Sequence, residues 1–240
     1  MGCTRMKGAS RFRSHLPAAA GFLFLWVLPL VPGGCGEERV VHGDVTVASE
    51  TRGLWALYSF DLEDVVRDSE GEALLVSDPS EEGGWDLAIS QWVIATASGS
   101  SVGPETDSRG ALLAVEGTVG DWPSLEDFTA QCSDFTSASE TNNDQPLSCS
   151  GDRTPTVDAG WIADSLDDPD GAGPFGTVSY HPSVTFWFEY EFTGHEVLPY
   201  GNIYVVETRA GDCVKLQVTD YYDESGSNGH VSFSWSFLSP

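Results

Sequence analysis

The sequence predicts an all-β fold, a single antiparallel β-sandwich or flattened barrel with long loops. Residues 184–192 and 230–237 alternate apolar and polar side chains with a period of two, which marks strands with one buried face. Further short segments rich in Val, Trp, Tyr and Phe recur along the chain. Helical signals are scarce and are limited to a capping-box pattern at residues 124–127.

The first segment of the chain predicts export. Residues 1–34 form a lipoprotein signal peptide, with a basic start, an apolar run and small residues before Cys35. The end of this segment, Gly33-Gly34-Cys35, resembles a bacterial lipobox, so Cys35 is the expected lipid-bearing first residue of the mature protein. The alternative is cleavage at another position, which would leave Cys35 as a free thiol.

A short tether and a β domain follow the signal. Residues 35–43 read as the tether from the lipid anchor, and residues 44–240 as the β domain. Residues 140–176 are mostly Asp, Gly, Pro, Ser and Thr, and predict long loops around a short strand at residues 157–162. Residues 209–212 form a good hairpin turn. The other predicted strands are residues 44–49, 54–60, 85–96, 111–118, 184–192, 203–208, 213–219 and 230–237.

The charge of the mature chain is strongly negative. Removal of residues 1–34 leaves seven Lys or Arg against 37 Asp or Glu, a formal charge of −30. Such a surface repels phosphate backbones, so the charge argues against nucleic acid as a partner. A solvated acidic surface explains most of this charge without a specific ligand.

The cysteines predict one disulfide. Cys132 and Cys149 flank a stretch rich in Ser, Thr and Asn that packs poorly, and a bridge between them would stabilise it by about 3 kcal/mol in an oxidising compartment. Cys213 is then left as a buried free thiol in a strand. No pair has Cys-x-x-Cys spacing, so a zinc ribbon or a thioredoxin-like site is unsupported.

No motif in the chain predicts an enzyme. Residues 99–103 match G-x-S-x-G, but no helical pattern follows them, so a Gly/Ser turn is the better interpretation and no catalytic residue is assigned.

A calcium site is the second candidate. An acidic run precedes Gly171, but Leu166 and Thr177 stand where an EF-hand needs ligands. A looser oxygen-rich calcium site stays open beside the simpler reading as an acidic turn. The acidic residues of this run are Asp164, Asp167, Asp168 and Asp170.

Two histidines form the third candidate site. His181 and His195 bracket the aromatic strand at residues 184–192, close to both of its ends. Two imidazoles near one aromatic surface could ligate a haem iron, because neutral imidazole nitrogen suits iron and apolar side chains suit the porphyrin face. The alternative is a pair of ordinary surface histidines in loops.

Two blocks of residues resemble a known family. The first block comprises Trp55-Ala56-Leu57-Tyr58-Ser59-Phe60, Val65-Val66, Trp85-Asp86-Leu87-Ala88-Ile89 and residues 96–101. The second comprises Phe188-Glu189-Tyr190, residues 203–208, Gly211, residues 214–223 (with Lys215-Leu216-Gln217 and Asp220-Tyr221-Tyr222-Asp223), Gly229 and Val231-Ser232-Phe233. Together these blocks resemble the HmuY-type haem-binding lipoproteins.

The resemblance implies an all-β haem scavenger on the outer membrane that hands haem to a transporter. It also implies two axial ligands, of which His195 matches one window (residues 191–195) and His181 is the upstream candidate. The membrane contact would run through the lipid on Cys35, from the cell surface or the periplasmic face. The acidic charge keeps two alternatives open, since haem propionates are anionic. One is a surface or periplasmic interaction lipoprotein of the same fold that has lost haem binding, and the other is a calcium-binding β domain.

Overall fold

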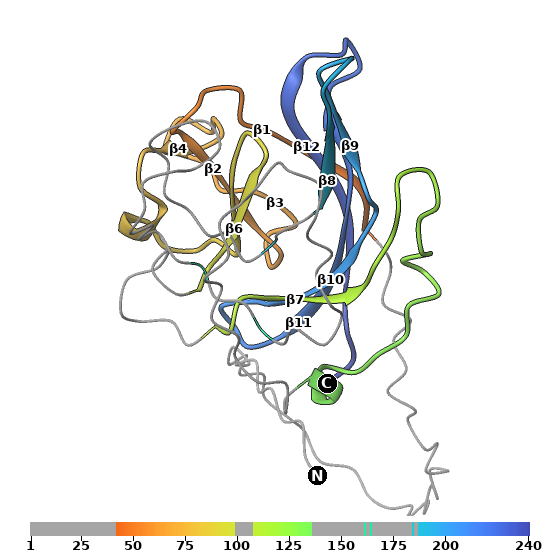
Figure 1. The fold of residues 1–240 in the computed structure, drawn as a ribbon. Coiled ribbons are helices and arrows are strands. Elements are labelled where there is room, and N and C mark those ends of the chain that lie inside the picture. The colour runs from red at the N-terminus through yellow and green to blue at the C-terminus, as the bar shows by residue number, and fades with distance from the viewer. Residues whose placement is uncertain (1–41, 99–107, 136–160, 162–163, 165–183, 185–186) are drawn as a thin grey trace, which may run out of the picture. The chain divides into compact units, whose positions relative to one another are not determined.

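The computed structural model describes residues 42–98, 108–135, 161, 164, 184 and 187–240, and this part of the chain is almost entirely β (Figure 1). Its helical elements are the short 3-10 helices η1 (Pro79–Glu81) and η3 (Cys132–Phe135), so the all-β prediction is confirmed. The strands are β1 (His42–Ala48), β2 (Trp55–Ser59), β3 (Asp64–Val65), β4 (Leu75–Val76), β5 (Leu87–Ser90), β6 (Val93–Thr96), β7 (Ala111–Val115), β8 (Phe188–Glu191), β9 (Glu196–Pro199), β10 (Ile203–Glu207), β11 (Cys213–Tyr222) and β12 (Asn228–Phe237).

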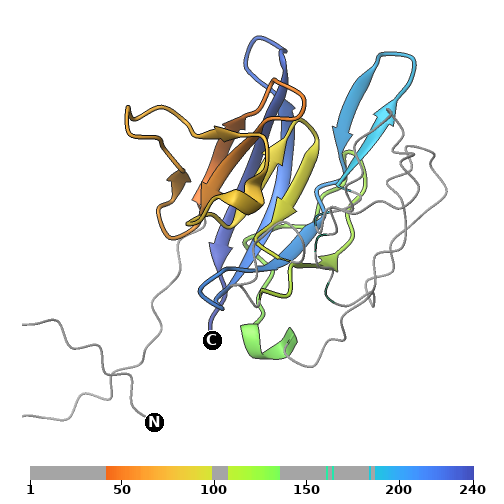
Figure 2. The same cartoon turned by 90° about the vertical axis from the view of Figure 1, so that its left-hand side faces the viewer.

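The strands form two larger antiparallel sheets and a hairpin. The first sheet has the order β1-β12-β11-β10-β7. The second has the order β3-β2-β5-β6, and β4 also pairs with β2. The remaining pair, β8 and β9, forms a two-stranded hairpin that stands to one side of the two sheets in Figure 2.

The two larger sheets share one core. Tyr58 and Ile89 of the second sheet and Leu216, Phe233 and Trp235 of the first all belong to a single buried cluster. The ring centroids of Tyr58 and Phe233 lie 5.1 Å apart in an edge-to-face contact. This packing confirms a sandwich and explains the alternation at residues 230–237, whose apolar side chains face the opposite sheet.

Two predicted strands differ in the structure. Residues 85–96 form a hairpin, β5 and β6, because Gln91 adopts a left-handed conformation (φ 52°) and the chain turns between Ser90 and Val93. Strand β8 is shorter than predicted within the described residues, and Phe192 is 66% exposed instead of facing the core. Phe192 begins the turn that follows β8, so it leaves the alternating pattern.

The disulfide joins Cys132 to Cys213, whose Cα atoms lie 5.3 Å apart. The predicted Cys132–Cys149 bridge is therefore wrong, and so is the free thiol at Cys213, although Cys213 is buried in a strand as expected. Backbone pairing supplies the reason. Cys132 N donates to Ser239 O at 2.8 Å, and Leu238 N donates to Cys213 O at 2.8 Å, so the C-terminal residues bring η3 beside the start of β11. Cys149 lies outside the described residues.

No helix in the described part of the chain is both long and apolar enough to cross a membrane.

Candidate haem-binding hairpin

The β8–β9 hairpin carries His195 and is fixed to the sandwich at its base. Trp187, which precedes β8, is buried, and its Nε1 donates to Trp92 O at 2.9 Å in the turn between β5 and β6. Tyr200 N, which follows β9, donates to Trp187 O at 2.9 Å. The two ends of the hairpin are therefore held to each other and to the second sheet.

The Asp-Tyr-Tyr-Asp segment of β11 supports the same hairpin. Tyr222 Oη accepts a hydrogen bond from Val197 N in β9 at 2.8 Å. The Tyr221 ring lies 6.3 Å from the Trp187 ring, centroid to centroid. Asp220 Oδ1 accepts from Tyr221 N and Tyr222 N at 2.7 and 3.1 Å, at a register shift of the β11–β12 pair. These motif residues thus position the hairpin.

The turn of the hairpin is closed by a carboxylate. Glu191 pairs with Glu196 at the end of the ladder, and its side chain accepts hydrogen bonds from Gly194 N and from Thr193 N. These bonds lower the pKa of the Glu191 carboxyl. His195 completes the turn in a left-handed conformation, with φ 58°. The backbone around His195 is therefore defined by side chains of its own hairpin.

The His195 side chain lies beside the ring of Tyr190 at the tip of the hairpin. Its Nδ1 lies 2.9 Å from Tyr190 Oη. The ring of Tyr190 in turn makes an edge-to-face contact with Phe192 at 5.1 Å between centroids. Within the described residues, Nε2 of His195 has no hydrogen-bond partner, and the side chain is exposed.

This arrangement fits a haem on one face. A neutral imidazole nitrogen can ligate haem iron, and the exposed ring of Phe192 on the same hairpin suits a porphyrin. The hairpin also carries a feature that does not favour haem. Its twelve positions, residues 188–199, include Glu189, Glu191 and Glu196 but no Lys or Arg to pair with the propionates.

The other predicted site residues fall outside the described part of the chain. His181, Cys35 and Cys149 all lie in segments that the structure leaves undescribed, so their roles stay predictions. The G-x-S-x-G segment, residues 99–103, lies there as well. Tyr190 was not predicted as a site residue, because alternation placed it on a buried face of its strand.

The structure gives Asp164, the first residue of the candidate calcium run, a different role. It is buried, and its carboxylate accepts hydrogen bonds from Thr96 N at 2.7 Å and Ser98 Oγ at 3.3 Å. No group of three or more metal-ligating side chains occurs among the described residues. Asp167, Asp168 and Asp170 lie outside them. The Asp164 carboxylate thus binds the end of β6 and the residues that follow it.

The Lys-Leu-Gln segment of β11 binds backbone carbonyls. Lys215 Nζ donates to Leu125 O at 2.6 Å and to Phe128 O at 3.0 Å, and burial lowers the pKa of this amine. Gln217 Nε2 donates to Pro123 O at 2.9 Å and to Gly201 O at 2.7 Å. Both side chains therefore hold the segment between β7 and η3 on the first sheet, and neither is available to a ligand.

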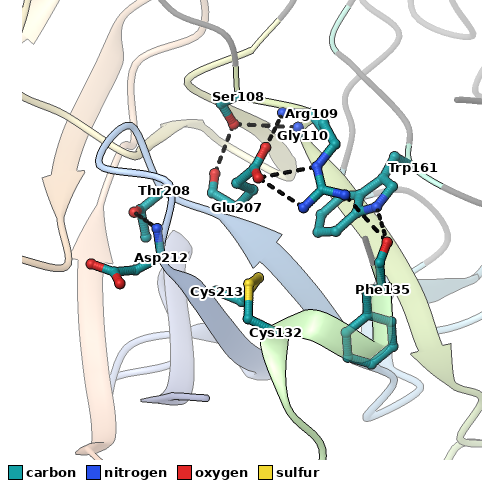
Figure 3. A network of polar contacts seen from close by, with 10 residues as sticks. All are labelled: Ser108, Arg109, Gly110, Cys132, Phe135, Trp161, Glu207, Thr208, Asp212 and Cys213. Atoms are coloured by element: carbon teal, nitrogen blue, oxygen red, sulfur yellow. Dashed lines mark hydrogen bonds and ion pairs between the residues drawn. A yellow bond between two sulfur atoms is a disulfide. The ribbon is translucent and has the colours of Figure 1, made fainter. Parts of the chain in front are cut away.

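Figure 3 shows a further network beside the disulfide, centred on Arg109. Its Nη2 lies 2.8 Å from Glu207 Oε1, and its Cζ lies 4.2 Å from the centre of the Trp161 ring. Arg109 Nη1 and Trp161 Nε1 both donate to Phe135 O, at 3.2 and 3.0 Å. The guanidinium is thus paired, stacked and hydrogen-bonded, which makes this network a structural brace between β10 and η3.

Comparisons with known proteins name the family. The sequence profile described as HmuY protein matches residues 53–235. No curated protein matches the chain. Among solved structures, the apo HmuY analog of Tannerella forsythia is 16% identical, with a TM-score of 0.45 over 85% of this chain and 98% of that one. Apo PinO from Porphyromonas gingivitis is 13% identical, with a TM-score of 0.42 over 83% and 97%.

A third structure comes from Bacteroides vulgatus and is described as an HmuY-like heme binding protein. It is 15% identical, with a TM-score of 0.44 over 80% of this chain and 90% of that one. The profile match spans most of the chain and includes both motif blocks, the sandwich core and the β8–β9 hairpin. This chain therefore belongs to the HmuY family.

Proposed function

We propose that this chain is an exported, lipid-anchored haem-binding protein, with His195 and His181 as axial ligands of the iron. The observation that carries the proposal is His195 itself. Its imidazole stands at the exposed tip of an aromatic hairpin, with Nε2 unengaged among the described residues. Family membership supports a binding protein and not an enzyme.

The hairpin would contribute one ligand and part of the porphyrin contact. When bound, haem would supply an iron that takes imidazole nitrogen as a ligand. His195 would hold this iron through the lone pair of Nε2. Phe192, which is 66% exposed, would cover apolar porphyrin surface and be removed from water. His181 is proposed as the second ligand on the strength of its place in the sequence.

Export and anchoring are the second part of the proposal. The signal at residues 1–34 and the lipid on Cys35 would tether the domain to the outer membrane, where a haem transporter is the expected partner. The Cys132–Cys213 bridge supports an oxidising compartment, because such bonds persist mainly outside the cytoplasm. Mass spectrometry of the mature N-terminus tests this part, since a diacylated or triacylated Cys35 is expected and an unmodified one would contradict it.

The haem proposal is tested by titrating the purified protein with ferric haem and recording its absorption. We expect a sharp Soret band that His195→Ala or His181→Ala abolishes. His230→Ala is the matched control, because His230 lies on β12 opposite Ala48 of β1 and already contacts Glu50 at 3.3 Å. A spectrum that does not change, or that survives replacement of both proposed ligands, would reject haem binding at this site.

A second function has one specific observation in its favour. The three glutamates of the hairpin, together with the absence of Lys and Arg from residues 188–199, disfavour an anionic ligand there. A surface or periplasmic interaction protein that keeps the fold without haem would account for this charge. It predicts no Soret change in the titration, so the same experiment separates the two functions.

A further inference from the structure

Tyr190 is placed to control the ring of His195. The two residues lie on either side of the hairpin turn, and Tyr190 Oη lies 2.9 Å from His195 Nδ1. Their ring centroids are 6.1 Å apart with the planes tilted by 51°, so the contact runs through the hydroxyl and not through stacking. The hydroxyl therefore touches the nitrogen that faces into the hairpin.

This contact matters because the two imidazole nitrogens have linked roles. Iron takes the lone pair of one nitrogen, and the other nitrogen must then carry the proton. A hydrogen-bond acceptor at the protonated nitrogen fixes the tautomer and the ring orientation, and it raises the basicity of the ligating nitrogen. With Tyr190 Oη accepting from Nδ1–H, the lone pair of His195 is left on Nε2.

One other acceptor close to His195 is already engaged. The Glu191 carboxylate is used by the N–H groups of Thr193 and Gly194 to close the turn. Tyr190 itself is held in place, because it is half-buried against the main core and packs edge-on against Phe192. A fixed hydroxyl and an exposed imidazole thus form a pair with a defined geometry.

We propose that Tyr190 is a positioning residue for haem, and that its hydroxyl orients the His195 ring and presents Nε2 to the iron. The inference rests on the proposed function, since it needs His195 to be a ligand. Tyr190 would not touch the iron. Loss of the hydroxyl would weaken the iron–imidazole bond without removing the ligand.

The test compares Tyr190→Phe with Tyr200→Phe. Tyr200 follows β9, and its hydroxyl makes no hydrogen bond within the described residues. Tyr200→Phe therefore removes one hydroxyl group, as Tyr190→Phe does, but breaks no hydrogen bond. We expect Tyr190→Phe to weaken ferric haem binding by roughly 10–100-fold and to keep the Soret band of a His195 complex. We expect Tyr200→Phe to bind like the wild type. Thermal melting of both apo proteins checks that each remains folded.

Two further readouts respond to the hydrogen bond and not to folding. In the apo protein, the ring ¹⁵N shifts of His195 should move in Tyr190→Phe and stay in place in Tyr200→Phe. In the haem complex, the reduction potential should rise in Tyr190→Phe, because Nδ1–H loses its acceptor, Nε2 becomes less basic, and a less basic ligand stabilises ferric iron less.

The outcomes separate the two proposals. If His195→Ala abolishes binding while Tyr190→Phe matches Tyr200→Phe in affinity and reduction potential, the positioning role is overturned and haem binding by His195 stands. If His195→Ala binds haem normally, the proposed function fails and the positioning role fails with it. If Tyr190→Phe abolishes the spectrum and His195→Ala does not, Tyr190 is the iron ligand, which also overturns the inference.

Discussion

Replacing the disulfide cysteines one at a time tests the topology that the structure assigns. The Cys132–Cys213 bridge closes a loop with a sequence separation of 81 residues. In the chain-entropy treatment a loop of this length stabilises the fold by about 4.5 kcal/mol. For a domain of this size that free energy corresponds to a fall in Tm of roughly 9–18 °C when the bridge is lost.

The assay is urea unfolding followed by tryptophan fluorescence under non-reducing conditions, with the wild type, Cys132→Ala, Cys213→Ala and Cys149→Ala. Cys132→Ala and Cys213→Ala should each lose about 4.5 kcal/mol of unfolding free energy. Cys149→Ala is the control and should behave like the wild type. The reasoning is refuted if Cys149→Ala is destabilised by about 3 kcal/mol, as a short Cys132–Cys149 loop requires, while Cys213→Ala is not.

Three further predictions follow from single contacts. Tyr222→Phe removes the hydroxyl that accepts from Val197 N and should lower the local stability of the hairpin by about 1–2 kcal/mol, measured as faster hydrogen exchange at Val197. An unchanged exchange rate would contradict the role of Tyr222 in holding the hairpin. Gly201→Ala should cost about 3 kcal/mol of unfolding free energy in urea, because Gly201 has φ +67° and an added Cβ would lie 2.2 Å from Trp122 Cγ. Gly226→Ala is the control and should cost only about 1 kcal/mol, because Gly226 has φ +81° but open space around the added Cβ. Equal costs for the two variants would argue against the Trp122 contact. Burial raises the pKa of the folded-state Asp86 carboxyl above its ordinary, unfolded-state value. Between the unfolded-state and the folded-state pKa the folded protein binds more protons, so its stability falls as the pH rises through that window, and Asp86→Asn should lack this share of the pH dependence. An NMR titration that puts the pKa of Asp86 in the ordinary range would refute this prediction.

The sheet strands were predictable where burial on one face dominates. Residues 230–237 alternate cleanly because Val231, Phe233 and Trp235 enter the core and the serines between them do not. The turn at residues 209–212 was predictable because Gly211 takes φ +81°, which glycine allows. In these segments local preference and tertiary packing agree.

Other features depend on contacts that local sequence does not encode. The β5–β6 turn carries a left-handed Gln91 where no Gly, Asn or Pro marks a turn. The disulfide depends on the C-terminal residues bringing η3 to the first sheet, and distance along the chain favoured the nearer Cys149.

Of the two residues at the tip of the hairpin, the sequence indicated one and not the other. His195 was found from its residue type and its place relative to the aromatic strand. Tyr190 was missed because period-two alternation counts it as a core residue. In the structure, Glu191 pairs with Glu196 across the turn, and this brings the Tyr190 hydroxyl beside the His195 imidazole. The five-residue separation across a tight turn is the signal that could have found it.

Electron paramagnetic resonance of the ferric haem complex tests the central claim most directly. Two imidazole ligands predict a low-spin ferric signal in the wild type, and His195→Ala should convert it to a high-spin signal or lose haem altogether. A wild-type signal that is high-spin, or that is identical in His195→Ala, would contradict ligation by the β8–β9 hairpin.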